Sequence, residues 1–300
     1  MIYIDRFTLP IDEEQDIMDA VMARNGGVHG YIDNPYPCRV FPDMQLSEIF
    51  FKSVTIFYGG NGSGKSTLLN LIAEKAGLKR IAPRNTGETF DLYVEKCGMT
   101  VAEDDYGERC AIPEGSRIIT SDDVFDYMLT MRTGNDEITE SKVRAKEDYA
   151  SLKYGRNIRF TGMDVYEEYR LQVMSRKKSV SRRDFIRETA GSETVLHSNG
   201  ETALRYFEER LENDTLYCLD EPENSLSPKL QLELVKMITE MSRLCGCQFI
   251  IATHSPFLLA MDGARIIDLD SRPAQYRNWW ELENCRIYFD FFDKNRHLFK

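Results

Sequence analysis

The sequence lacks the features of several protein classes. No apolar run approaches the roughly 20 residues that span a bilayer, and the N-terminus lacks the basic and then apolar layout of a signal peptide. The chain has seven cysteines and four histidines, and no two cysteines have C-x-x-C spacing. A zinc site is therefore not expected. We expect a soluble, cytoplasmic protein with reduced thiols and no direct membrane insertion.

The chain also lacks an excess of positive charge. It has 49 acidic and 38 basic side chains, so its formal net charge is −11. A protein that coats nucleic acid or anionic membrane with its whole surface would have the opposite balance. One local basic cluster lies in residues 176–187. It is either a helix face paired with nearby carboxylates or a contact for phosphate or nucleic acid, and we favour the former because only one aromatic residue, Phe185, lies among the basic residues.

A glycine-rich stretch at residues 58–67 is the strongest motif in the sequence. Residues 54–57 before it predict a buried strand, and residues 68–75 after it predict a helix. A strand, a glycine-rich turn and a helix in this order are typical of a phosphate-binding loop, in which backbone N–H groups and the helix N-terminus face the anion. The predicted nucleotide-binding residues are Gly59, Asn61, Gly62, Ser63, Gly64, Lys65, Ser66 and Thr67. Lys65 would reach the β- and γ-phosphates, and Ser66 would bind Mg²⁺.

Strands and helices alternate again from residue 216 onward. The segments 216–219, 249–252 and 265–269 predict strands, and residues 228–241 predict an amphipathic helix. Such alternation indicates an α/β fold with a mostly parallel sheet that is covered on both faces. In sheets of this kind, ligands bind beyond the carboxyl ends of the strands.

Three polar residues follow these strands directly. Asp220 and Glu221 come after the first strand, and His254 comes after the second. We predict that Asp220 holds Mg²⁺ and that Glu221 activates or positions the water that attacks the γ-phosphate. His254 would donate a hydrogen bond to that phosphate. The predicted catalytic residues are therefore Glu221, His254 and Lys65.

The middle of the chain has a different character. Residues 122–207 are densely charged and predict a helical insertion, with helices at 124–132, 141–154, 165–174 and 182–189. Before it, residues 90–96 and 117–120 predict strands of a small antiparallel region, and residues 38–41 predict a further strand. Residues 12–22 predict a helix with acidic residues in its first turn.

These motifs resemble those of the ATP-binding-cassette (ABC) ATPases, in particular the soluble SMC-like and RecF-like branch. The phosphate loop, a signature-like segment at 198–201, the acidic strand at 216–221 and the histidine segment at 253–255 stand in the family's order. The signature-like segment begins a predicted helix at 201–211, and residues 223–227 stand at the position of the family's D-loop. The resemblance implies that Ser198 and Gly200 also bind nucleotide. It further implies a P-loop NTPase fold with ATP and Mg²⁺ as cofactors.

The resemblance also implies a domain division and a mode of action. Residues 1–121 and 208–300 would form the nucleotide-binding core, with an aromatic segment at its C-terminal end, and residues 122–207 would form the helical subdomain. Two copies would meet head to tail as a homodimer on ATP binding, with each ATP between the loop of one copy and Ser198 and Gly200 of the other. Hydrolysis of the β–γ phosphoanhydride would drive a change in an effector protein or on nucleic acid.

Two other functions are compatible with the motifs. The first is the ATP-binding subunit of a membrane transporter, and the second is a nucleotide-dependent switch without significant catalysis. We favour the stand-alone ATPase because no glutamine stands at the Q-loop position near residues 120–123, where Ser121 or Asp122 is the nearest substitute. The signature-like segment also differs from the family, with His197 before Ser198. The presence of Glu221 disfavours the switch.

Two groups of aromatic residues have alternative interpretations. Tyr31 or Tyr36 would stack on an adenine ring, or both would simply pack or lie on the surface. The C-terminal aromatic segment, residues 279–292, is either a helix docked on the core or a surface for a partner. We favour the docked helix because apolar residues mostly pack.

Overall fold

The computed structural model describes residues 1–25, 31–103, 107–156, 158, 165–177, 181, 184–186, 189 and 198–299. The chain forms two compact units. The first contains Met1–Val124 and Asn199–Lys300, and the second contains Phe125–Ser198. Among the described residues, no helix is both long and apolar enough to cross a membrane.

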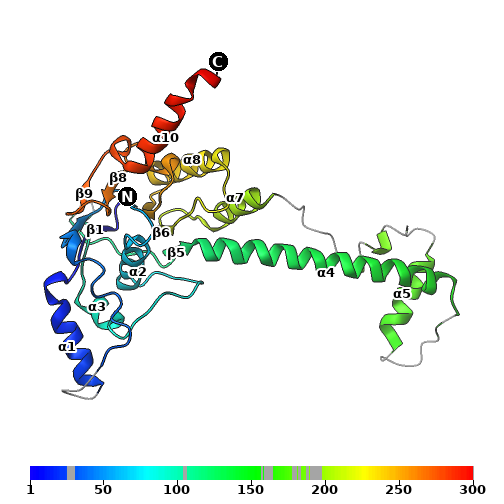
Figure 1. Ribbon diagram of the computed structural model, residues 1–300. Helices are drawn as coiled ribbons and strands as arrows, with labels where there is room; N and C mark the ends of the chain where they lie inside the picture. The colour runs from blue at the N-terminus through cyan, green and yellow to red at the C-terminus, as the bar shows by residue number, and fades with distance from the viewer. Residues whose placement is uncertain are drawn as a thin grey trace. The chain divides into compact units, whose positions relative to one another are not determined.

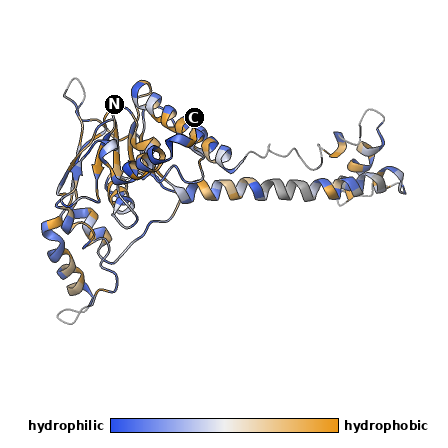
Figure 2. Cartoon of the chain, turned by 45° about the horizontal axis from the view of Figure 1, so that its top comes forward, coloured by the Kyte–Doolittle hydropathy of each residue, from blue (hydrophilic) through white to orange (hydrophobic). Residues whose placement is uncertain are grey.

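Within the described residues, a six-stranded sheet forms the centre of the first unit (Figure 1). Its order is β5 (Arg117–Thr120), β6 (Leu216–Asp220), β7 (Gln248–Ala252), β3 (Val54–Tyr58), β8 (Arg265–Asp268) and β9 (Gln275–Tyr276). The first five strands are parallel, and β9 pairs antiparallel at the edge. Every residue of β3 and β7 is buried. The hydrophobic strands at the centre of Figure 2 therefore have the apolar runs expected of a covered parallel sheet.

Helices lie on this sheet as the motifs predict. Helix α2 (Lys65–Lys75) contacts β6 and β7, and its Leu68, Leu69 and Ile72 are fully buried. Helix α8 (Pro228–Leu244) contacts β7 and α7 (Asn199–Arg210). The helix predicted at residues 12–22 is present as α1 (Glu14–Arg24), which follows a 3-10 turn, η1 (Ile11–Glu13).

A three-stranded antiparallel sheet is also present, but other segments form it. Its order is β2 (Glu48–Phe50), β1 (Ile4–Thr8) and β4 (Gly98–Val101). The strand at 117–120 is instead β5, which pairs parallel with β6.

Two predicted strands are wrong. Residues 38–41 form turns before the 3-10 helix η3 (Pro42–Met44), and Arg39 has a φ of 71° there. Residues 90–96 form helix α3 (Phe90–Lys96), in which Phe90 and Tyr93 are fully buried. Side chains three residues apart share one face of a helix but point to opposite faces of a strand.

The second unit is helical. Helix α4 (Ser121–Tyr154) begins in the first unit and joins the predicted segments 124–132 and 141–154 into one helix. Helix α5 (Tyr166–Arg176) follows, and its buried Gln172 donates hydrogen bonds to the carbonyl oxygens of Leu152 and Arg156. Since α7 lies in the first unit, the predicted helical part 122–207 is longer at its C-terminal end than this unit. Half of the predicted helix 182–189 lies outside the described residues, as do Lys178, Arg182, Arg183 and Arg187 of the basic cluster.

Candidate active site

The loop between β3 and α2 depends on its glycines. Gly62 and Gly64 have φ values of +81° and +89°, a backbone conformation that residues with a side chain rarely adopt. A Cβ on Gly59 would collide with the Ser63 side chain. Helix α2 begins at Lys65, so the N–H groups of its first turn point to the mouth of the loop. This arrangement suits a phosphate group.

Two side chains of the loop fit an anionic ligand. Lys65 is only 5% exposed, and its Nζ donates hydrogen bonds to the carbonyl oxygens of Gly59 (2.7 Å) and Gly60 (3.0 Å). The hydroxyl of Ser63 is buried and has no hydrogen-bond partner within the described part of the chain. A buried cation and a buried hydroxyl without a partner are the groups that phosphate oxygens can satisfy.

Ser66 and Asp220 meet across α2 and β6. The Ser66 Oγ donates a hydrogen bond to the Asp220 Oδ1 at 3.0 Å. Burial raises the pKa of Asp220 to about 6, and the Ser66 hydroxyl partly opposes this shift. A hydroxyl oxygen and a carboxylate oxygen are hard ligands of the kind that Mg²⁺ prefers, and Mg²⁺ commonly takes only one or two protein ligands beside substrate phosphates. The pair therefore fits Mg²⁺, although the described residues contain no cluster of three or more His, Cys, Asp or Glu suited to a metal ion.

Glu221 follows β6 in an unusual backbone conformation. Its φ is 47°, in the left-handed region that non-glycine residues seldom occupy. Its N–H donates to the carbonyl oxygen of Ala252 at the end of β7 (2.9 Å), which holds this conformation in place. The Asn224 side chain donates to the Glu221 Oε2 at 3.2 Å. Strain of this kind clusters at functional sites.

His254 lies beside Glu221, as the sequence predicts for the ends of adjacent strands. Its Nδ1 is 3.7 Å from the Glu221 Oε1 and 3.5 Å from the Glu223 Oε1. Its imidazole is 47% exposed and therefore accessible from solvent. The structure thus brings Lys65, Ser66, Asp220, Glu221 and His254 to one end of the sheet.

Glu223 is a further residue of this site, at the start of the predicted D-loop, and the sequence predicts no individual role for it. Its carboxylate is only 5% exposed, and its Oε1 accepts hydrogen bonds from the Thr253 Oγ1 (2.6 Å) and from the His254 N–H (3.1 Å). Its Oε2 is buried without a hydrogen-bond partner among the described residues. In the sequence, Glu223 is marked only by its place two residues after Glu221, at the start of the predicted D-loop.

Ser198 and Gly200 differ in where they lie. Ser198 is the last residue of the second unit, whereas Gly200 is in the first turn of α7 in the first unit. A Cβ on Gly200 would lie 2.7 Å from the Leu230 Cδ1 and 3.2 Å from the Ser225 carbonyl oxygen. A side chain here would crowd Leu230 and the Ser225 backbone, so α7 begins close against residues 225–227 of the predicted D-loop at 223–227.

At the Q-loop position, the side chain that packs inward is Asp123. It is 5% exposed, and its Oδ2 accepts hydrogen bonds from the N–H (2.7 Å) and hydroxyl (2.9 Å) of Thr120. Its Oδ1 accepts one from the Ala82 N–H (2.8 Å). These bonds resemble a capping box at the start of α4. Of the predicted substitutes, Ser121 is half-buried and Asp122 is exposed.

The two adenine-stacking candidates have different surroundings. Tyr31 is 75% exposed. Tyr36 is half-buried and stacks on Phe90, with ring centroids 6.0 Å apart. Burial raises the pKa of Tyr36, and a hydrogen bond with Thr67 of α2 opposes this shift. Tyr36 therefore already packs one ring face against protein, and its hydroxyl reaches the phosphate-loop helix.

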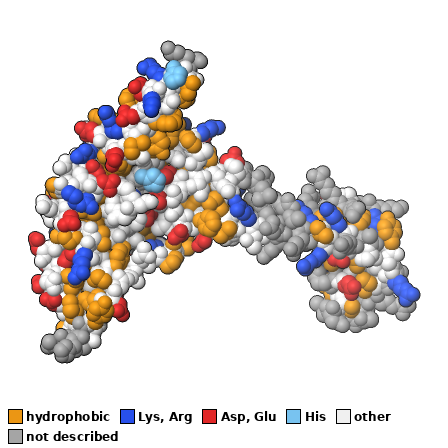
Figure 3. Space-filling view, in the orientation of Figure 1, with side chains coloured by type: hydrophobic (Ala, Val, Ile, Leu, Met, Phe, Trp, Pro, Cys, Tyr) orange, Lys and Arg blue, Asp and Glu red, His pale blue; other side chains and the backbone are white. Residues whose placement is uncertain are grey.

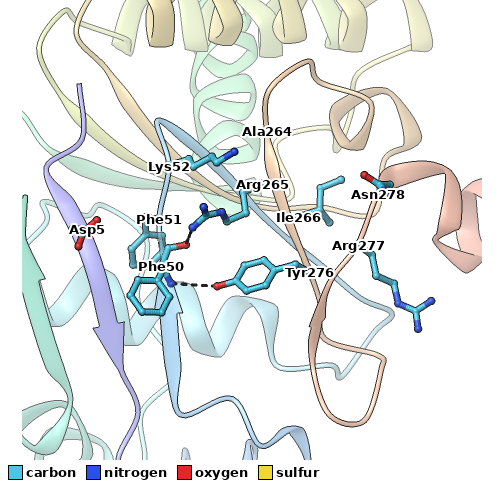
Figure 4. Close-up of a pocket in the computed structure, with 10 residues that line it drawn as sticks. All are labelled: Asp5, Phe50, Phe51, Lys52, Ala264, Arg265, Ile266, Tyr276, Arg277 and Asn278. Atoms are coloured by element: carbon cyan, nitrogen blue, oxygen red, sulfur yellow. Dashed lines mark hydrogen bonds between the residues drawn. The ribbon is translucent and has the colours of Figure 1, made fainter.

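A hollow of about 650 Å³ lies at the opposite end of the strands (Figure 4). Arg265 there donates to the Phe50 carbonyl oxygen at 2.9 Å, and its guanidinium lies over the Tyr276 ring. The Phe50 N–H donates to the Tyr276 hydroxyl at 3.4 Å. These contacts join the edges of the two sheets. Because Arg265 begins β8 and the phosphate loop follows the other end of β3, the hollow contains none of the motif residues.

Part of the chain matches a known protein family. Residues 195–260 match the family model described as "AAA domain, putative AbiEii toxin, Type IV TA system". No curated protein sequence matches the chain. The SMC head domain from Thermotoga maritima is 13% identical, with 92% of this chain and 98% of that chain covered and a TM-score of 0.38.

Two further solved structures are similar. The Smc head domain from Pyrococcus furiosus, bound to the C-terminal domain of ScpA, is 12% identical, with 99% and 100% of the two chains covered and a TM-score of 0.42. CbiO1 from Clostridium perfringens, part of an ABC transporter complex, is 17% identical, with 84% and 90% covered and a TM-score of 0.33. The predicted α/β fold with a mostly parallel sheet is confirmed, and residues 195–260 are similar to an AAA-domain family.

Proposed function

We propose that this chain binds ATP with Mg²⁺, hydrolyses the β–γ phosphoanhydride and dimerises around the nucleotide. One observation carries the proposal, namely the meeting of three elements beyond the carboxyl ends of β3, β6 and β7. The Ser66 Oγ lies 3.0 Å from the Asp220 Oδ1, and the His254 Nδ1 lies 3.7 Å from the Glu221 Oε1. The family match over residues 195–260 supports ATPase activity.

The loop residues bind the phosphates in this proposal. The N–H groups at the start of α2 and the ammonium of Lys65 face the β- and γ-phosphate oxygens. Ser66 and Asp220 hold Mg²⁺, which neutralises charge on the phosphates. The buried Ser63 hydroxyl gains the partner that it lacks in the described chain.

Glu221 is the catalytic carboxylate in this proposal. It orients a water molecule for attack on the γ-phosphorus and accepts a proton from it. Asn224 holds one carboxylate oxygen, and the strained backbone fixes the direction of the side chain. His254 is exposed enough to reach the γ-phosphate and donates a hydrogen bond to it as charge shifts onto the leaving group.

A second copy completes the site. Ser198 and the start of α7 at Gly200 from that copy would close over the phosphates. The opening and closing of this homodimer would act on an effector protein or on nucleic acid. The transporter alternative is less favoured because Asp123, at the Q-loop position, is buried in a local cap.

Glu221→Gln tests this proposal. The amide cannot accept the proton, so we expect phosphate release to fall at least a hundredfold while ATP binding is retained. The variant should accumulate as an ATP-dependent dimer, measured by light scattering with and without ATP and Mg²⁺. Asn213→Gln, on a loop before β6, is the matched control. Wild-type turnover by Glu221→Gln, together with no ATP-dependent change in mass, would contradict the proposal.

A further inference from the structure

The C-terminal segment exposes a large apolar surface. It consists of helix α10 (Glu283–Lys294) and the 3-10 helix η6 (Arg296–Phe299). Seven of its apolar side chains are between 48% and 71% exposed, namely Ile287, Tyr288, Phe289, Phe291, Phe292, Leu298 and Phe299. At about 200 Å² per side chain, they present roughly 800 Å². These side chains lie on several sides of α10, so only part of this area forms one patch, but a contiguous apolar patch of a few hundred Å² is already large for a monomer and requires a cover.

Only the first turn of α10 is docked on the first unit. Leu282 and Cys285 are buried, and Asn284 donates hydrogen bonds to the Tyr58 hydroxyl and to the His254 carbonyl oxygen. The helix then runs away from the sheet (Figure 1), and hydrophobic side chains gather along it (Figure 3). The predicted docked helix is therefore wrong beyond its first turn, because the sheet ends where the helix continues.

The face that Cys285 turns to the core continues along α10 into solvent. Phe289 and Phe292 lie four and seven residues after Cys285 and share its stripe, yet they are 62% and 51% exposed. A hollow of about 470 Å³ opens beside them, lined by Phe289, Phe292, Asp293, Arg296 and Phe299. Aromatic walls with a charged rim are typical of the pocket that receives an apolar anchor at a protein interface.

The charges beside this stripe indicate what covers it. Arg286 and Asp293 are both exposed, and their spacing of seven residues places them on the same flank of the stripe. If two α10 helices pair antiparallel and cross midway between these two residues, Arg286 of each copy faces Asp293 of the other. In a symmetric parallel pair the two flanks would lie on opposite sides of the interface, and these residues would not meet. The flank is therefore self-complementary in one orientation.

We propose that the stripe of α10, together with η6, is an interface between two copies of this chain, with the two α10 helices antiparallel. Phe289, Phe292, Leu298 and Phe299 present roughly 500 Å² on each copy, so neighbouring residues complete the roughly 800 Å² that one partner contributes to an interface of ordinary size. The pairing is symmetric, so the same patch serves on both copies. It needs no nucleotide and does not depend on the proposed ATP-dependent dimer.

Sedimentation equilibrium of the full chain, with EDTA and without nucleotide, tests the interface. We expect a dimer at about 50 µM. Phe289→Asp combined with Phe292→Asp should raise the dissociation constant at least a hundredfold. Lys294→Glu, a charge reversal on the opposite side of α10, is the control and should leave it unchanged. A monomeric wild-type chain at this concentration would overturn the proposal and leave another protein as the occupant of the surface.

A charge-reversal cycle tests the orientation. Arg286→Glu and Asp293→Arg should each raise the dissociation constant about tenfold or more, because each places like charges together twice in the symmetric pair. The two reversals combined should restore the wild-type constant. Failure of the combined variant to restore it would overturn the antiparallel arrangement. Circular dichroism of each variant confirms that the chain is folded.

The two dimers are distinguished by a further arm. Glu221→Gln is combined with Phe289→Asp and Phe292→Asp, and its mass is measured with and without ATP. A monomer that becomes a dimer only with ATP supports both interfaces. If the wild-type chain dimerises without nucleotide but the triple variant stays monomeric with ATP, the proposed function is contradicted and the α10 interface is still supported.

Discussion

Replacement of Glu223 tests whether this buried carboxylate holds His254 in position. Its Oε1 accepts from the Thr253 hydroxyl at 2.6 Å and from the His254 N–H at 3.1 Å. Glu223→Ala removes both hydrogen bonds and leaves the buried Thr253 hydroxyl without an acceptor, although its oxygen still accepts from the Ser255 N–H. At about 1.5 kcal/mol for each bond to a charged group, the free energy of unfolding should fall by about 3 kcal/mol.

The conservative substitution separates the role of the oxygen from that of the charge. In Glu223→Gln the amide oxygen can accept from the same two donors, and the amide nitrogen replaces the Oε2, which has no partner among the described residues. We therefore expect a loss of about 1 kcal/mol or less. The rate of ATP hydrolysis should fall about ten- to hundredfold in the Ala variant, because His254 loses its anchor, and should recover in the Gln variant.

Urea unfolding and phosphate release measure the two effects. Thr253→Val removes one of the donors and is the partner in a double-mutant cycle, in which we expect a coupling energy of about 1–2 kcal/mol with Glu223→Ala. The reasoning is refuted if Glu223→Ala unfolds at the wild-type urea concentration and hydrolyses ATP at the wild-type rate.

Three further predictions concern the phosphate loop and the metal ligands. Lys65→Ala should weaken ATP binding at least a hundredfold in equilibrium titration, and an unchanged dissociation constant would count against the loop. Gly64→Ala should lower the free energy of unfolding in urea by about 1–2 kcal/mol because φ is +89° there, and it should also weaken ATP binding. Gly77→Ala is the control for backbone strain alone, because φ is +66° there at the end of α2, and it should lose stability without losing ATP binding. The raised pKa of Asp220, about 6, means that the carboxylate of the metal-free protein takes up a proton as the pH falls below 6. Apparent Mg²⁺ affinity in calorimetric titration should therefore fall about tenfold from pH 7 to pH 5, and pH-independent affinity would contradict Asp220 as a ligand.

The parts of the fold that the sequence predicts well have strong local patterns. Neighbouring residues specify the strand before the loop at 59–67 and the helix after it. They likewise specify β6, β7 and α8. The seven residues of α3 are too few for the pattern to decide, because Phe90, Leu92 and Val94 alternate like a strand while Phe90 and Tyr93 repeat like a helix. Burial of Phe90 and Tyr93 on the same side selects the helix.

Other features depend on pairing between distant segments and leave no local pattern. Strand β1 pairs with β2 and β4, which begin more than 40 and more than 90 residues later. The role of Glu223 arises because Thr253, 30 residues away, lies against it. The exposed face of α10 has the composition of a docked helix, and only the three-dimensional structure shows that its second half is uncovered by the described residues.

The two hydrogen bonds of Asn284 give α10 a thermodynamic consequence. Asn284 connects the exposed helix to the Tyr58 hydroxyl before the phosphate loop and to the His254 backbone after β7. A shift of α10 that alters these bonds changes the free energy of the site in its nucleotide-bound and nucleotide-free forms. By reciprocity, any factor by which self-association through α10 alters ATP affinity must equal the factor by which ATP alters self-association. A higher protein concentration would then change the affinity for ATP, and a higher ATP concentration would change self-association.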